Sequence, residues 1–65
     1  MKPGDVAMPS RIMRAAEVAE YLQIHLVTLY KLVRKRQIPA FKVGNEIRFH
    51  RDAIEKWMID RHVNG

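Results

Sequence analysis

Two short apolar stripes, separated by three residues that interrupt their phase, constrain the fold of this chain most. The first stripe follows the i, i+3, i+4, i+7 spacing of one helix face and consists of Ala15, Val18, Ala19 and Leu22. After the interruption at residues 23–25, the second stripe consists of Leu29, Leu32 and Val33. The spacing predicts one helix over residues 15–22 and a second from about residue 26 to 35, joined by a tight turn.

Two further elements follow the second helix. Pro39 ends that helix, because the residue before a proline is pushed out of the α region. Residues 41–49 then predict a β-hairpin. Residues 52–60 predict a third helix. Its apolar stripe consists of Ile54, Trp57 and Met58, and the aliphatic stem of Arg61 continues it.

The alternation within the hairpin predicts its register. A three-residue loop over 44–46 would place Phe41 opposite Phe49, with Lys42 and Arg48 together on the other face. A two-residue loop would mix apolar and charged residues on both faces. The pattern therefore favours the three-residue loop, which places two positive charges opposite each other. Such a pair is tolerated where that face meets an anion; the alternative is that both long side chains extend into water.

The chain is short enough for one domain only, and its stability depends on its apolar core. Its 65 residues contain no cysteine, so neither a disulfide nor a cysteine-bound zinc supports the fold. We expect Trp57 to anchor the core against Phe41 or Phe49. The complete predicted core is Val18, Leu22, Leu29, Leu32, Val33, Phe41, Phe49, Ile54 and Trp57. Residues 1–11 are predicted to be a flexible tail, residues 12–61 the domain, and residues 62–65 a frayed end.

Positive charge is concentrated in the middle of the chain. The net charge is +5, and residues 31–36, Lys-Leu-Val-Arg-Lys-Arg, hold four cations and no carboxylate. Glu46 is the only acidic residue in 31–51, against Lys31, Arg34, Lys35, Arg36, Lys42, Arg48 and Arg51. This distribution indicates one basic face for an anionic partner. The alternative is a solvated helix end, where the macrodipole also favours cations.

Four segments resemble, in order and spacing, the DNA-binding domain of the excisionase family. They are AEVAEYL at 16–22, TLYKLVR at 28–34, IPAFKVG at 38–44 with IRF at 47–49, and DAIEKWM at 52–58. They are similar to that family's EEVAEYL, TVYRLVR, LPAFRVG…WRF and DLEAWL segments. The resemblance implies a MerR-like winged helix-turn-helix. Such a fold is mainly α with a small β-hairpin: two helix-turn-helix helices, a two-stranded wing and a C-terminal capping helix.

The same resemblance implies a function. It indicates a sequence-specific protein that binds double-stranded DNA, acting as a recombination directionality factor or as a small transcriptional regulator. Several positions depart from the family pattern. Gln23 and Arg36 stand where the family has glycine, and a left-handed backbone at Gln23 would cost roughly 1 kcal/mol. Leu26 and Val27 replace polar residues, and Asn45 with Glu46 replaces a more basic wing tip.

The outward face of the second helix supplies the candidate base-reading residues. Helical geometry points this face away from the apolar stripe, and its members are Val27, Thr28, Lys31 and Arg34. Candidate phosphate or wing contacts are Tyr30, Lys35, Lys42, Arg48 and Arg14. For Tyr30 a half-buried aromatic covering the core is an equally good interpretation, and for Arg14 so is free solvation.

The sequence carries no pattern typical of catalysis. The histidines do not recur at metal-ligand spacing and no acid pair flanks a nucleophile, so we expect no enzyme activity, metal or cofactor. The apolar Leu26 and Val27 leave open a protein-interaction module, and RNA binding is a weaker alternative. Expected partners are double-stranded DNA, further copies of the chain on adjacent sites, or a recombinase. No apolar run could span a bilayer and residues 1–5 lack a signal-peptide pattern. We therefore expect a cytoplasmic, nucleoid-associated protein with no membrane partner.

Overall fold

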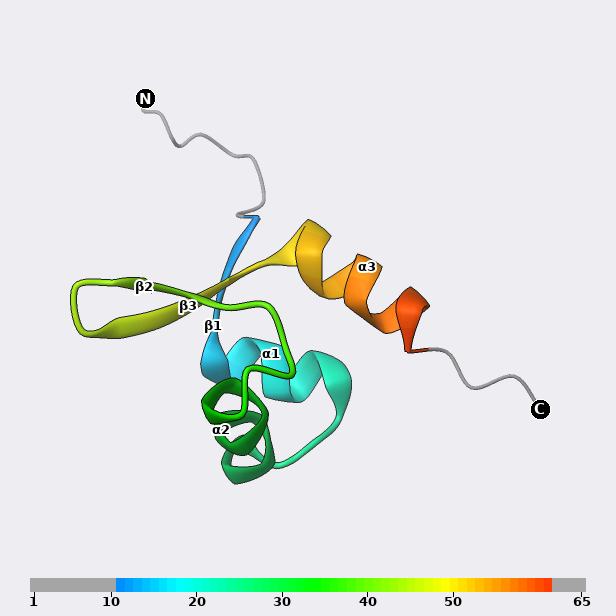
Figure 1. Cartoon of the computed structure of the whole chain (residues 1–65), viewed down its shortest axis with the longest axis horizontal. Coiled ribbons are helices and arrows are strands. Elements are labelled where there is room, and N and C mark those ends of the chain that lie inside the picture. Colours follow the sequence, from blue (N-terminus) through cyan, green and yellow to red (C-terminus); the bar gives the residue numbers. More distant parts are fainter. Residues whose placement is uncertain (1–10, 62–65) are drawn as a thin grey trace.

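A computed structural model describes residues 11–61, which form three helices and a small three-stranded antiparallel sheet (Figure 1). The predictions of a tail and of a frayed end fall mostly on residues 1–10 and 62–65, which lie outside the described residues. In chain order the elements are β1 (Ile12–Arg14), α1 (Ala15–Leu22), α2 (Leu26–Arg34), β2 (Phe41–Val43), β3 (Glu46–His50) and α3 (Arg51–Asp60). The three predicted helices are confirmed to within one residue at each end.

Helix α1 is capped at both ends by local hydrogen bonds. At its start the Glu17 carboxylate accepts a hydrogen bond of 2.8 Å from the backbone N–H of Arg14, where the positive end of the helix dipole favours an anion. At its end Gln23 adopts the left-handed conformation, with φ 58° and ψ 46°. The N–H of Gln23 donates to the Glu20 carbonyl at 3.1 Å, and that of Ile24 donates to the Ala19 carbonyl at 2.9 Å. These paired bonds form a Schellman motif, which satisfies carbonyls at the helix end.

Helix α2 ends on the same motif. Arg36 has a φ of 57°. Its N–H donates to the Val33 carbonyl at 3.0 Å, and the N–H of Gln37 donates to the Leu32 carbonyl at 2.9 Å. The two non-glycine residues with a left-handed backbone, Gln23 and Arg36, are therefore the two positions at which the excisionase pattern has glycine. The strained backbone considered for Gln23 is observed, and Arg36 shares it.

The sheet has the order β1–β3–β2, so β3 is its central strand. Strand β1 was not predicted, and the predicted two-stranded hairpin is part of a three-stranded sheet. In the β1–β3 pair Met13 lies opposite Phe49 and Arg14 opposite Arg48. Three residues are too few to show an alternation, and the strand forms because β3 supplies its hydrogen-bonding partners. In Figure 1 the tip of the β2–β3 hairpin extends away from the helices.

The predicted hairpin register is wrong. The turn has two residues, Gly44 and Asn45, and Gly44 takes a φ of +63°, as the first central residue of a type II′ turn requires. The observed partners are Phe41 with Arg48, Lys42 with Ile47, and Val43 with Glu46. The prediction assumed that one face of β2 is buried, but all three residues of this edge strand are exposed, so turn geometry sets the register.

The core lies between α1, α2, α3 and β3. Its fully buried members, all predicted, are Val18, Leu29, Phe49 and Ile54, and Ala15, Ala19 and Ile38 complete it. Four other predicted members are half-buried and pack against these: Leu22, Leu32, Val33 and Trp57. Phe41 is 39% exposed, so its assignment to the core is wrong because β2 has no element covering it.

Trp57 joins α3 to the end of α2. Its indole Nε1 donates a hydrogen bond of 2.8 Å to the carbonyl of Gln37, the last residue of the α2 Schellman motif. The guanidinium of Arg61 lies over the ring system, 4.8 Å from its centroid. The predicted role of Trp57 as an anchor therefore includes a specific polar contact as well as packing.

Candidate nucleic-acid interface

Helix α2 presents an exposed row of side chains opposite its buried face. Leu29 is fully buried, and this fixes the rotation of the helix. Val27, Lys31 and Arg34 follow one another at i, i+4 and i+7 and are all exposed, with Val27 at 65%. Thr28, also exposed, flanks the row. The four candidate base-reading residues therefore lie together on one accessible surface.

The N-terminus of α2 is open. His25 occupies the N-cap position in an extended conformation and makes no side-chain capping bond, and the first turn has no acidic residue. The positive end of the helix dipole is thus not neutralised by the helix's own side chains. This end carries Leu26 and Val27, which are 42% and 65% exposed.

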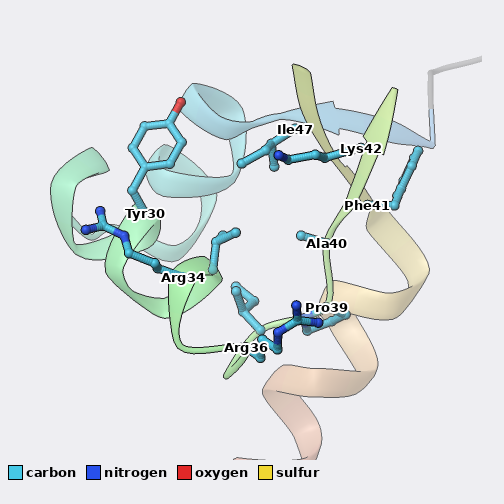
Figure 2. A pocket seen from close by; sticks show the side chains of 10 residues that line it. Tyr30, Arg34, Arg36, Pro39, Ala40, Phe41, Lys42 and Ile47 are labelled. Atoms are coloured by element: carbon cyan, nitrogen blue, oxygen red, sulfur yellow. The ribbon is translucent and has the colours of Figure 1, made fainter. Parts of the chain in front are cut away.

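A groove of about 700 Å³ separates α2 from the hairpin (Figure 2). Its apolar lining includes Val33, Ile38 and Ile47. Three cations from three different segments also line it: Arg34, Arg36 and Lys42. Figure 2 shows Arg34 and Tyr30 on the α2 side, Pro39 to Lys42 on the opposite side, and Arg36 at one end. No carboxylate is among the lining residues, so the groove is an electropositive channel with an apolar floor.

Lys42 and Arg48, predicted to share a face, lie on opposite faces of the hairpin. Lys42 is opposite Ile47, and both line the groove (Figure 2). Arg48 instead donates to the Ile47 carbonyl at 2.9 Å and forms a short ion pair with Glu46, and its side chain is 27% exposed. Of the two predicted wing cations, only Lys42 therefore joins the α2 surface.

Tyr30 and Arg14 lie where α2 approaches the sheet. Tyr30 is 37% exposed and lines both the groove and a smaller hollow that Arg14 and Arg48 also line. Tyr30 thus borders the basic surface; it is not among the residues that pack against the core, and its phosphate contact stays a prediction. Lys35, the last phosphate candidate, is exposed at the C-cap of α2.

Two arginines at the start of α3 are engaged by carboxylates. Arg11 pairs with Asp52 at 3.0 Å. Arg51 pairs with Glu55 at 3.2 Å, and the Glu55 carboxylate, by its hydrogen bond and charge, raises the pKa of the Arg51 guanidinium. The basic character of the central segment is therefore concentrated on α2 and β2 rather than spread to the start of α3.

Arg36 lines the groove but is not among the candidate site residues predicted from the sequence. Its signals were its place in the run of four cations at 31–36 and its departure from the family's glycine. Within residues 11–61 no group of three or more His, Cys, Asp or Glu side chains could hold a metal ion. The same residues contain no helix long and apolar enough to cross a membrane.

Comparison with known proteins identifies the class of this chain. Residues 12–62 match the family described as "Helix-turn-helix domain", and the chain belongs to that family. Two curated relatives from Mycobacterium tuberculosis are named "Putative DNA-binding protein MT0521" (strain CDC 1551) and "Putative DNA-binding protein Rv0500A" (strain H37Rv). Each is 33% identical to this chain over 45 residues, which are 69% of this chain and 58% of the relative. No solved structure gives a significant match.

Proposed function

We propose that this protein binds double-stranded DNA sequence-specifically, with α2 in the major groove and the β2–β3 hairpin as a wing on the neighbouring backbone. One observation carries the proposal. The exposed row on α2 and the electropositive groove beside it form a continuous surface that contains four cations and no carboxylate: Lys31, Arg34, Arg36 and Lys42. A surface of this kind suits a polyanion of regular shape.

Each side of this surface has a distinct role. The residues proposed to read base edges are Val27, Thr28, Lys31 and Arg34, because they lie on the exposed side of the second helix, which enters the major groove in this class of domain. Val27 suits a thymine methyl group, and Lys31 or Arg34 suits guanine. The proposed phosphate contacts are Tyr30, Lys35, Lys42, Arg48 and Arg14. Arg48 contributes less than Lys42, since a phosphate must compete with Glu46 for it.

The biological role that fits best is of excisionase type. The chain acts as a recombination directionality factor or as a small transcriptional regulator, and it is a binding protein rather than an enzyme. Membership of the helix-turn-helix family and the names of the two relatives support DNA as the partner. A single module of this kind covers about 600–1,000 Å² of protein surface. Useful specificity therefore comes from further copies on adjacent sites or from fusion to another domain, and a recombinase is a candidate partner.

Selection of bound sequences from a random duplex pool tests the proposal and supplies a preferred site. On that site Arg34→Ala is expected to cost about 1–3 kcal/mol and to relax the choice at one base pair. Lys35→Ala is the matched control. It should weaken preferred and random duplexes by similar factors, because a phosphate contact carries no sequence information. Both variants are measured by fluorescence anisotropy at one fixed salt concentration.

Two results would contradict this assignment. A pool that yields no enriched sequence would remove sequence-specific recognition. Equal weakening of preferred and random DNA by Arg34→Ala would make Arg34 a backbone contact and leave reading to Val27, Thr28 and Lys31.

A second candidate function rests on the exposure of Leu26 and Val27. An apolar pair exposed at 42% and 65% at the start of α2 suits a protein contact as well as a base edge. Binding that persists at high salt and is lost in Leu26→Ala would favour this interaction module. A steep salt dependence with duplex DNA favours the first function.

A further inference from the structure

The groove between α2 and β2 has the chemistry of a site for one particular part of a DNA molecule. Its side chains fall into two kinds: cations, and apolar or aromatic groups. None is an amide, a small hydroxyl or a carboxylate, the groups that pair with adenine or cytosine edges. Apart from Arg34, which lines it from the α2 side, the groove is thus poorly equipped to read bases.

We infer that this groove holds a segment of the sugar–phosphate backbone of one DNA strand, and that Arg36 is a phosphate ligand in it. The inference rests on the proposed function and deepens it. Lys42 lies toward one end of the groove and Arg36 at the other, with the Pro39–Ala40 segment forming the wall between them (Figure 2). The apolar floor of Val33, Ile38 and Ile47 suits deoxyribose carbons, and the cations at the ends suit the phosphates that flank them.

The side chain of Arg36 is free to act in this way. Among residues 11–61 it has no carboxylate partner, unlike Arg11, Arg48 and Arg51, which all have one. Its backbone is held in the left-handed conformation by the Schellman motif, at a cost that a glycine would avoid. The motif also directs the chain straight into the buried Ile38, so the base of the Arg36 side chain is fixed beside the groove.

Arg36→Gly is an unusually clean test because it removes the side chain and relieves the strain together. A structural defect would lower both the melting temperature and the affinity. A lost phosphate contact should lower the affinity while the melting temperature stays equal or rises. Arg36→Lys keeps the charge, and Lys56→Ala removes one exposed cation from α3, outside the groove.

The measurement is anisotropy of a labelled duplex at several salt concentrations, with the preferred site and a random duplex. Arg36→Gly should reduce the slope of log K against log salt by about 0.9, which corresponds to roughly fivefold weaker binding at 0.15 M salt. The loss should be equal on both duplexes. Arg36→Lys should keep the wild-type slope, and so should Lys56→Ala. Arg36→Gly combined with Lys42→Ala should reduce the slope by about 1.8.

The possible outcomes separate this inference from the function on which it rests. If wild-type protein binds duplex DNA but Arg36→Gly has the same salt slope as wild type and Lys56→Ala, Arg36 lies outside the interface. The inference alone then fails. If Arg36→Gly weakens only the preferred site, Arg36 reads a base and the backbone assignment fails. If wild-type protein binds no duplex, the proposed function fails and this inference fails with it.

Discussion

The two helices of the helix-turn-helix end on the same backbone motif but are joined to α3 by contacts of very different quality. Behind the end of α1, the Tyr21 hydroxyl donates to the Glu55 carboxylate at 3.3 Å, in an exposed cluster where Arg51 lies over the ring of Tyr21. Behind the end of α2, the half-buried Trp57 donates to the Gln37 carbonyl at 2.8 Å. One motif thus ends a helix at the surface, and the other also anchors a third helix.

This difference shows that the hydrogen bond alone contributes little of the free energy by which such a contact stabilises the fold. Solvated groups exchange a bond to water for a bond to protein and gain little. Trp57 adds the burial of a large ring against the core to a hydrogen bond that is itself exposed. We therefore expect the stability of the domain to depend far more on the contact at α2 than on the one at α1.

The largest expected effect is that of Trp57→Ala. Loss of the ring should cost about 3–5 kcal/mol of unfolding free energy, enough to unfold a domain of marginal stability. Trp57→Phe, which keeps an aromatic ring but loses the indole N–H, should cost only about 1 kcal/mol. Urea denaturation followed by circular dichroism measures both. An unchanged midpoint for Trp57→Ala would show that α3 does not depend on this anchor.

An intermediate effect of opposite sign is expected at the two left-handed residues. Gln23→Gly and Arg36→Gly should each raise the unfolding free energy by about 0.5–1 kcal/mol. Glycine relieves the Cβ clash at positive φ, while its greater freedom in the unfolded chain offsets part of that gain. Gln23→Ala and Arg36→Ala keep the Cβ and serve as matched controls without this gain. If both glycine variants melted below wild type, strain at the helix ends would be ruled out.

The smallest expected effect is that of Tyr21→Phe. Removal of the hydroxyl should cost no more than about 0.5 kcal/mol, because Tyr21 and Glu55 both remain hydrated. The same denaturation experiment compares it with Trp57→Phe. Each of the two variants removes one side-chain hydrogen bond between α3 and the end of another helix. A cost equal to that of Trp57→Phe would erase the contrast between the two helix ends.

The helices could be predicted from the sequence because each buries one face. The stripe from Ala15 to Leu22 matches α1 residue for residue, and Leu29 is buried as its spacing requires. The sheet could not be predicted in the same way. Strand β2 is exposed on both faces, so its alternation of Phe41, Lys42 and Val43 carries no information on register. The positive φ of Gly44 decides it instead.

The candidate site also has one part that the sequence predicts and one part that it does not. The exposed row on α2 follows from helical geometry once Leu29 is buried, so the sequence was sufficient for it. The groove depends on where the chain returns beside α2 after Pro39, and no local pattern encodes that position. Arg36 was missed for this reason. Lys42 was identified as a candidate, but it was placed beside Arg48 instead of across the groove from α2.

The contact between Trp57 and Gln37 also provides the molecule with an optical probe of its own. Trp57 is the one tryptophan in the sequence, so all indole emission comes from the junction of α3 with the end of α2. Its wavelength depends on the hydrogen bond of the excited ring and on access of water to it. Arg36 lies directly before Gln37 in the chain. Binding of a DNA strand at Arg36 would therefore shift the wavelength of the Trp57 emission, so that binding is measured without any label on the protein.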